Sequence, residues 1–153
     1  MGVSGCGKST IGSSLAEKLG WIFIESDDYH SEEHIHKMAS GIPLTDVDRL
    51  PWLETLHALL SELNQKNQPV VLACSALKEK YRQTLINGLR NVQFVYLKGD
   101  YELIWKRMQE RQHYMKPSML KSQFEALEEP ENALVIDVAL PPERIILEIL
   151  RHI

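Results

Sequence analysis

The decapeptide MGVSGCGKST (residues 1–10) carries Gly2, Gly7, Lys8 and Ser9 in the arrangement G-x-x-x-x-G-K-[ST]. In this pattern the glycines let backbone N–H groups turn toward phosphate, the lysine reaches the outer phosphates and the serine hydroxyl ligates magnesium. Such a loop normally follows a β-strand and opens a helix, whereas only Met1 precedes it here. The stretch is therefore either a nucleotide site whose first strand is missing from the chain, or a chance match.

The residues after this loop favour a genuine nucleotide site. Ile11, Leu15 and Leu19 share one helical face, and Gly20 is suited to end that helix. The apolar run at 21–25 then predicts a strand. Loop, helix and strand in this order are what phosphate binding at a helix N-terminus requires. We therefore expect the whole loop to bind nucleotide phosphates: Gly2, Val3, Ser4, Gly5, Cys6, Gly7, Lys8, Ser9 and Thr10.

Short apolar runs alternate with helical patterns along the rest of the chain. The runs at 21–25, 69–74, 92–97 and 133–137 are nearly continuous, as in strands of a parallel sheet covered on both faces. This alternation predicts an α/β three-layer sandwich with a parallel sheet, in which ligands bind beyond the carboxyl ends of the strands.

Helical spacing marks three further segments. The first has Pro51 suited to its first turn, the second is closed by Gly88, and the third starts at residues 141–144. Their apolar faces are formed by Leu53, Leu56, Leu60 and Leu63, by Leu77, Tyr81 and Leu85, and by Ile145, Ile149 and Ile153.

Composition bounds the class of protein. The 153 residues suit one domain, and 44% hydrophobic and 25% charged residues are ordinary globular values. A formal charge of -4 argues against a general nucleic-acid-binding surface. No apolar run approaches the roughly 20 residues of a membrane span, and no secretory signal is evident. Two cysteines and six histidines show neither disulfide nor metal-ligand spacing. We therefore expect a cytoplasmic domain that binds neither membranes nor nucleic acid.

Three carboxylates follow the strand predicted at 21–25. Glu25, Asp27 and Asp28 should lie at the carboxyl edge of the sheet, where a carboxylate can orient or deprotonate a substrate hydroxyl, or hold magnesium through water. The alternative is that they cap the next helix, but Ser31 is itself a good cap for it. Three carboxylates are more than capping needs.

Basic residues near two other strand ends have two interpretations each. Arg49 is either a fixed anion clamp or the surface partner of Asp46 or Asp48, and the sequence favours neither. With Ser75 as cap of the next helix, Lys78 and Arg82 would lie on one face near its N-terminus. Cations there oppose the helix dipole, which suggests an anionic ligand between them. The alternative is a solvated face with Glu79 as partner.

A polar segment interrupts the helical pattern at residues 111–119. It contains Pro117 and follows Arg107 and Arg111, which share one side of a helix and repel each other mildly. An incoming polyphosphate would relieve that repulsion, as phosphoryl transfer requires. We interpret the region near 107–124 as a lid, with an ordinary surface loop as the alternative.

Several stretches together resemble one family. They are GVSGCGKST (2–10), DDYH (27–30), KMASGIPLTDVDRLPWL (37–53), ACSALKEKYR (73–82), LKGDYELI (97–104) and SQFEALEEP (122–130). In order and spacing they resemble the gluconate kinases, P-loop small-molecule kinases near the shikimate and nucleoside monophosphate kinases. The resemblance implies MgATP-dependent phosphorylation of the 6-hydroxyl of D-gluconate, in carbohydrate acid catabolism feeding the pentose phosphate pathway. It also implies a five-stranded parallel sheet, a lid and a homodimer.

The resemblance also implies roles for individual residues. Lys8 and Ser9 would hold phosphates and magnesium, with Glu25 near the metal, and Asp27 would act on the reacting hydroxyl. The gluconate carboxylate and polyol would be bound by Arg49, Lys78 and Arg82, with His30 and Lys37 nearby. Arg107 and Arg111 would close over the nucleotide phosphates.

Two expectations remain open at this point. In the family order, a strand before the phosphate loop lies between the strands starting near Pro69 and Val92, so we expect an upstream apolar strand in the native protein. The alternative is a real short form that is poorly folded or inactive. The competing functions are a kinase for another small hydroxy acid or a nucleotide, and a non-catalytic nucleotide-binding protein.

Overall fold

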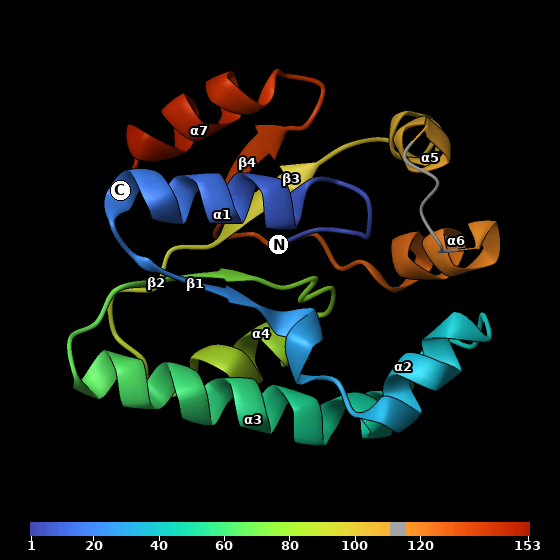
Figure 1. Cartoon of the computed structure of the whole chain (residues 1–153), viewed down its shortest axis with the longest axis horizontal. Helices are drawn as coiled ribbons and strands as arrows, with labels where there is room; N and C mark the ends of the chain where they lie inside the picture. The colour runs from blue at the N-terminus through green and yellow to red at the C-terminus, as the bar shows by residue number, and fades with distance from the viewer. Residues whose placement is uncertain (111–115) are drawn as a thin grey trace.

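The computed structural model describes residues 1–110 and 116–153 (Figure 1). The four predicted strands are confirmed, each beginning one to three residues later than its apolar run. They are β1 (Ile22–Glu25), β2 (Val70–Ala73), β3 (Val95–Lys98) and β4 (Leu134–Asp137).

The strands form two parallel pairs. β1 pairs with β2, with Glu25 opposite Ala73, and β3 pairs with β4, with Lys98 opposite Asp137. Because both pairs are parallel, the carboxyl ends within each pair meet at one edge. Within the described residues the expected parallel sheet is thus present as two halves.

Helices cover both faces of the strands (Figure 1). One layer holds α1 and α7, and the opposite layer holds α3 and α4. Each layer has its own apolar core, one centred on Ile104, Leu120 and Ile149, the other on Leu53 and Leu56. The helices are α1 (Lys8–Leu19), α2 (Glu32–Ala39), α3 (Asp46–Gln65), α4 (Glu79–Ile86), α5 (Tyr101–Glu110), α6 (Pro117–Ala126) and α7 (Pro142–Leu150), with the 3-10 turn η1 (Ser26–Tyr29) before α2. None of the helices described is long and apolar enough to cross a membrane.

One helix start and one helix end differ from the sequence prediction. α3 begins at Asp46, not near Pro51, because Thr45 and Asp48 form a capping box. Pro51 is tolerated inside the helix since the carbonyl it leaves without a partner belongs to Val47, a residue 81% exposed to water. α7 likewise ends before the predicted face residue Ile153.

The start predicted for α4 is wrong as well. Ser75 does not cap this helix, whose N-cap is Lys78. Ala76 adopts a left-handed conformation with φ 44, which turns the chain after β2 and delays the helix. Ser31, in contrast, caps α2 as predicted and accepts a hydrogen bond from the His34 N–H.

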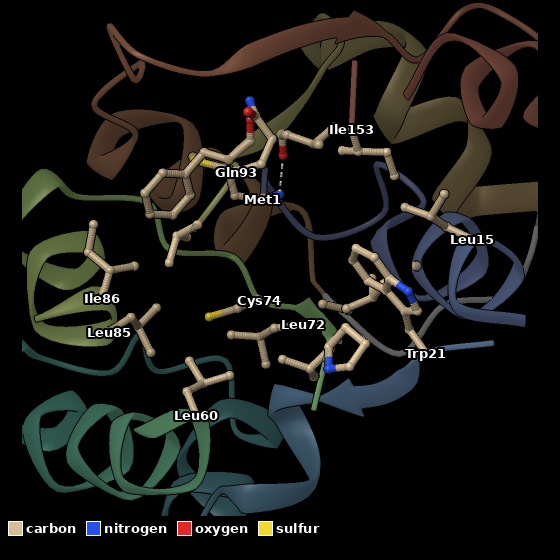
Figure 2. A pocket seen from close by; sticks show the side chains of 18 of the residues that line it. Met1, Leu15, Trp21, Leu60, Leu72, Cys74, Leu85, Ile86, Gln93 and Ile153 are labelled. Atoms are coloured by element: carbon tan, nitrogen blue, oxygen red, sulfur yellow. Dashed lines mark hydrogen bonds between the residues drawn. The ribbon is translucent and has the colours of Figure 1, made fainter. Parts of the chain in front are cut away.

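Met1 lies between the two strand pairs (Figure 2). Its amino group donates to the Val95 carbonyl, and its own carbonyl accepts from the Leu97 N–H at 2.9 Å. On the other side, the Gly2 N–H donates to the Ser75 carbonyl at 3.2 Å. These bonds place Met1 in a parallel ladder with β3, next to the end of β2.

An apolar groove continues from Met1 along β2 and β3 (Figure 2). Its volume is about 720 Å³, far above the water-sized voids common in protein interiors. The walls are formed by the two strands and by apolar side chains of both helical layers, among them Ile11, Leu15, Leu60, Leu85 and Ile149.

Candidate functional site

The phosphate loop lies at the carboxyl edge of the strands. The hydrogen bonds of Met1 and Gly2 to β3 and to Ser75 fix the start of the loop there, and α1 begins directly after it at Lys8. The amide end of α1 therefore points into the same region as the loop N–H groups, which is the arrangement that favours a bound anion.

Glycine is required inside this loop at Gly5. Its φ of +79 is strained for other residues, and a Cβ atom there would lie 2.6 Å from the side chain of Met108. Gly7, the N-cap of α1, has φ 101 and offers no side chain to satisfy the first amides. The N–H groups at the start of α1 are thus left uncapped and can be presented to a ligand.

The side chains at the end of the loop are available for phosphate and metal. Lys8 Nζ donates to the Val3 carbonyl at 2.9 Å, so it folds back over the loop. Ser9 and Thr10 are exposed at the first turn of α1. These positions match what the G-x-x-x-x-G-K-[ST] pattern predicts, and the roles themselves remain predictions.

The predicted carboxylates follow β1 directly. Glu25 is its last residue and half-buried, while Asp27 and Asp28 lie in η1 and are exposed. The Asp27 side chain is 72% exposed, and its Oδ1 lies 3.7 Å from Nε2 of His30. Since Asp27 keeps most of its surface in water, it is free to meet a substrate.

His30 is held by aromatic stacking. Its ring lies 4.3 Å from the Trp52 ring, which is itself fixed by a 2.8 Å hydrogen bond from Nε1 to the Ser26 carbonyl. Burial lowers the pKa of His30 below its usual value, although the Asp27 carboxylate opposes the shift. Nδ1 of His30 is buried and has no hydrogen-bond partner in the described part of the chain.

Asp46 organises a cluster of charges between α3 and α4. Its carboxylate accepts hydrogen bonds from Lys80, from the Tyr81 hydroxyl and, at 3.2 Å, from Lys78. The bonds from Lys80, Tyr81 and Lys78 hold the pKa of Asp46 well below its usual range. Burial, and after it the hydrogen bond to the same carboxylate, raises the pKa of Tyr81. Asp46 is therefore ionised and fixes Lys78 in place.

Arg49 contacts this cluster through Tyr81 and not through a carboxylate. Its guanidinium donates to the Leu44 carbonyl and to the Tyr81 hydroxyl, at 3.4 Å in the second case, and stacks over the Tyr81 ring. No carboxylate lies within ion-pair distance of Arg49 among the described residues. The surface pairing with Asp46 or Asp48 considered from the sequence is thus not formed.

A small cavity opens between this cluster and α6. It has a volume of about 310 Å³ and a mixed polar and apolar lining, which suits a small polar molecule. Its lining residues are Pro43, Leu44, Thr45, Asp46, Arg49, Leu77, Lys78, Ser122, Gln123 and Ala126. Of the predicted substrate-binding residues, Arg49 and Lys78 meet here.

Arg82 does not reach this cavity. Its side chain is 2% exposed and donates to the carbonyls of Ala76 and Leu77 at 2.9 and 3.2 Å and to the Glu79 carboxylate at 2.9 Å. The predicted shared face with Lys78 is not formed, because Lys78 is the N-cap and Arg82 points into the turn after β2. This geometry gives Arg82 a structural task.

Replacing Arg82 should therefore destabilise the fold. Arg82→Met leaves the carbonyls of Ala76 and Leu77 without a donor, and we expect the free energy of unfolding to fall by about 2–4 kcal/mol. Urea unfolding measures this, with the exposed Arg144→Met as matched control. A stable Arg82→Met variant with a raised KM for the acceptor would instead make Arg82 a substrate ligand.

The remaining predicted basic residues lie elsewhere. Lys37 pairs with Asp48 at 2.7 Å, and this bond is the main cause that holds the pKa of Asp48 below its usual range. Arg107 donates to the Val138 carbonyl at 2.7 Å. Arg111 lies outside the described residues, as does most of the polar segment interpreted as a lid. α6 begins directly at Pro117.

Three residues of the site were not predicted as such. Asp46 was considered only as a partner of Arg49, Tyr81 only as an apolar face residue, and Gln123 only as part of a quoted stretch. Tyr81 and Asp46 are 35 positions apart in the sequence, so no local sequence pattern predicts the hydrogen bond between them. Gln123 carries a weak signal, since it is polar between the apolar Leu120 and Phe124 of α6.

Comparison with known proteins places this site in a family. The profile of the family described as shikimate kinase matches residues 4–150. The thermosensitive gluconokinase of Escherichia coli (strain K12) is 52% identical over 132 residues, covering 86% of this chain and 71% of the relative. A probable gluconokinase of Mus musculus is 48% identical over 159 residues, covering 90% of this chain and 86% of the relative.

Solved structures agree with the sequence relatives. The crystal structure of a gluconokinase from Sinorhizobium meliloti 1021 superposes with a TM-score of 0.90 at 43% identity, covering 99% of this chain and 87% of that one. The α/β fold and the resemblance to ATP-using kinases expected from the sequence are thereby confirmed. The chain belongs to the gluconokinase family of shikimate-kinase-like P-loop kinases.

Proposed function

We propose that the protein transfers the γ-phosphoryl group of ATP to the 6-hydroxyl of D-gluconate, giving 6-phospho-D-gluconate and ADP. The observation that carries this is the joint presence of the phosphate loop and of a small cavity holding Arg49 and Lys78, in a chain 52% identical to a gluconokinase.

Arg49 is the better candidate for the gluconate carboxylate. It lines the cavity and has no carboxylate partner within the described residues, whereas the donors of Arg82 are already engaged by Glu79 and by backbone carbonyls. Guanidinium binds carboxylate through two parallel hydrogen bonds. Lys78, held by Asp46, supplies a second positive charge and donors for the polyol hydroxyls. His30 and Lys37 lie outside the lining and would contact only the far end of a bound acid.

The phosphoryl-transfer groups are assigned by position. Lys8 would neutralise the outer phosphates of ATP, and Asp27 would orient or deprotonate the attacking hydroxyl. Arg107 and Arg111 would stabilise the charge that develops on the transferred group. Arg107 would first leave the Val138 carbonyl that it now contacts.

The oxygen donors near the loop fit magnesium. Ser9 presents an exposed hydroxyl at the start of α1, and Glu25 ends β1 with a half-buried carboxylate. Mg²⁺ prefers such oxygen ligands and keeps several waters. Ser9 would hold the ion directly and Glu25 would hold it through water, and the ion would supply positive charge that neutralises the phosphates.

Acceptor specificity tests the proposed function. ADP release with MgATP should depend on D-gluconate and should stay at background with shikimate or AMP. Shikimate is the relevant control because the family profile that matches the chain is the one described as shikimate kinase. Release with shikimate in place of gluconate would assign the other acceptor, and background release with every acceptor would contradict a kinase of this class.

We further propose that an apolar β-strand, joined to the nitrogen of Met1, fills the groove between β2 and β3. Met1 already makes strand-type hydrogen bonds with Val95 and Leu97. Neighbouring strands in a sheet lie about 4.8 Å apart. Since Met1 alone bridges β2 and β3, the gap between these two strands has the width of one strand. Since both faces of the groove are apolar, the strand would be a continuous apolar run. It would complete a five-stranded parallel sheet.

Three broader features are also proposed, and the last of them rests on the family resemblance alone. The chain would form one kinase domain over residues 1–153 with a lid near 107–124, it would work in the cytoplasm, and it would assemble as a homodimer. Sedimentation velocity of the purified protein decides the last point, because a monomer at micromolar concentration would contradict it.

A further inference from the structure

Gln123 joins α6 to the phosphate loop by two hydrogen bonds. Its Oε1 accepts from the Ser4 N–H at 2.7 Å, and its Nε2 donates to the Ser4 hydroxyl at 3.0 Å. The two residues are 119 positions apart in the sequence. The opposite amide orientation would set an NH₂ group against the Ser4 N–H, so only one orientation satisfies both bonds. The contact is therefore a specific two-point link.

The same residue lines the small cavity that holds Arg49 and Lys78. Ser122, Gln123 and Ala126 of α6 form one side of this cavity, and residues at and just before the starts of α3 and α4 form the other. Ser4 in turn follows Val3, whose carbonyl accepts from Lys8. Gln123 thus lies where the phosphate loop and the cavity meet.

α6 is anchored well enough to transmit a change at Gln123. Met119 and Leu120, on the same helix, are 4% and 0% exposed and pack in the core. A shift of Ser4 acts on the helix through Gln123, and the helix carries Ser122 and Ala126 of the cavity wall with it. Packed helices move as rigid units in this way, because tightly packed cores do not deform continuously.

We propose that Gln123 is a positioning residue that couples the phosphate loop to the acceptor cavity. The loop N–H groups form the concavity that binds phosphate; in this proposal the bound phosphate shifts Ser4, and the Ser4–Gln123 link passes the new loop position to the α6 wall of the cavity. Bound nucleotide therefore raises the affinity for the acceptor, and the acceptor raises the affinity for nucleotide by the same factor. The inference rests on the proposed function for the identity of the acceptor.

Gln123→Met tests this coupling, because methionine keeps the length of the side chain and loses both polar atoms. The matched control is Glu125→Gln on the exposed side of α6. Calorimetry would measure gluconate binding with and without a non-hydrolysable ATP analogue, and steady-state kinetics would separate kcat from KM.

We expect Gln123→Met to lower kcat/KM for gluconate by about 10- to 100-fold, the effect of a small misplacement of reacting groups. The effect of the analogue on gluconate affinity should disappear, while affinity for the analogue alone and the melting temperature stay near those of Glu125→Gln. Coupling that survives in Gln123→Met would overturn the proposal. So would a loss of activity that merely follows a loss of melting temperature.

Ser4→Ala completes a double-mutant cycle. If the two side chains act through one link, the double variant should be no worse than Gln123→Met, whereas independent residues would give additive losses. Additive losses would therefore count against the link.

A readout without acceptor separates this proposal from the proposed function. The nucleotide analogue alone should slow amide hydrogen exchange in α6 of the wild type and of Glu125→Gln, and it should not do so in Gln123→Met. Protection in all three proteins would contradict the role of Gln123. Wild-type protein that shows this protection yet does not phosphorylate gluconate would contradict only the acceptor assignment.

Discussion

Asp27→Asn should reduce turnover of D-gluconate by about 100- to 10,000-fold, the usual contribution of a positioned general acid or base. The change keeps the shape of the side chain and removes the charge and the basicity. Asp27 lies in η1 at the carboxyl end of β1 and is 72% exposed, so the fold does not depend on it. Affinity for ATP should stay unchanged, since the phosphate loop is left intact. Steady-state kinetics and calorimetry with an ATP analogue measure the two effects.

Asp28→Asn is the control for this prediction. Asp28 lies next to Asp27 in the same turn and is also exposed, so a general loss of negative charge would affect both variants alike. Equal losses in the two variants would assign the effect to local charge. Unchanged turnover in Asp27→Asn would remove Asp27 from the mechanism.

Local patterns predicted most of the elements that carry this site. Continuous apolar runs identified the four strands, and the spacing of Ile11, Leu15 and Leu19 with a terminal glycine gave α1 its correct end. These signals are local because the spacing of apolar residues along the sequence shows which face of a helix or strand is buried. The placement of the phosphate loop, Glu25 and Asp27 at the strand ends follows from that order.

The acceptor cavity was only partly predictable. In the turn after β2, Ala76 adopts a left-handed conformation. Glycine is the usual sequence signal for this conformation, and it is absent at this position. The Arg82 side chain is consequently directed into that turn. Asp46 binds Lys78, Lys80 and Tyr81 from another helix, a contact set by packing. Only the three-dimensional structure therefore shows that Lys78 lines the cavity while Arg82, four positions later, has a structural role.

Adding an apolar strand before Met1 should raise the melting temperature by roughly 10 °C. Val95 directs its carbonyl toward Met1, so its N–H faces the groove as well, because both groups of one strand residue point to the same neighbour. A strand of about four residues would satisfy such groups on both β2 and β3, at about 1 kcal/mol for each hydrogen bond. A domain of this size gains about 2–4 °C for each kcal/mol. Thermal unfolding of chains with and without an apolar extension measures the gain.

The matched control carries the same apolar extension with proline at its centre. Proline lacks the N–H group that a central strand must donate, so this extension keeps its hydrophobicity and loses its pairing. If both extensions stabilise the protein equally, the groove binds apolar chain without forming a strand. If neither does, the proposal of a central strand is wrong.

The pH dependence of stability gives an independent check. Burial lowers the pKa of the Met1 amino group from 8.0 to about 6. In the 153-residue chain the folded state therefore binds fewer protons than the unfolded state between about pH 6 and pH 8, and stability rises as the pH rises through that window. An extension turns this amine into an amide that cannot titrate, so the rise above the ordinary histidine pKa of about 6.5 should vanish in both extended chains, while the contribution of His30 below it stays. If stability still rises in this way in the extended chains, the titrating group responsible is not the Met1 amine and lies outside the groove.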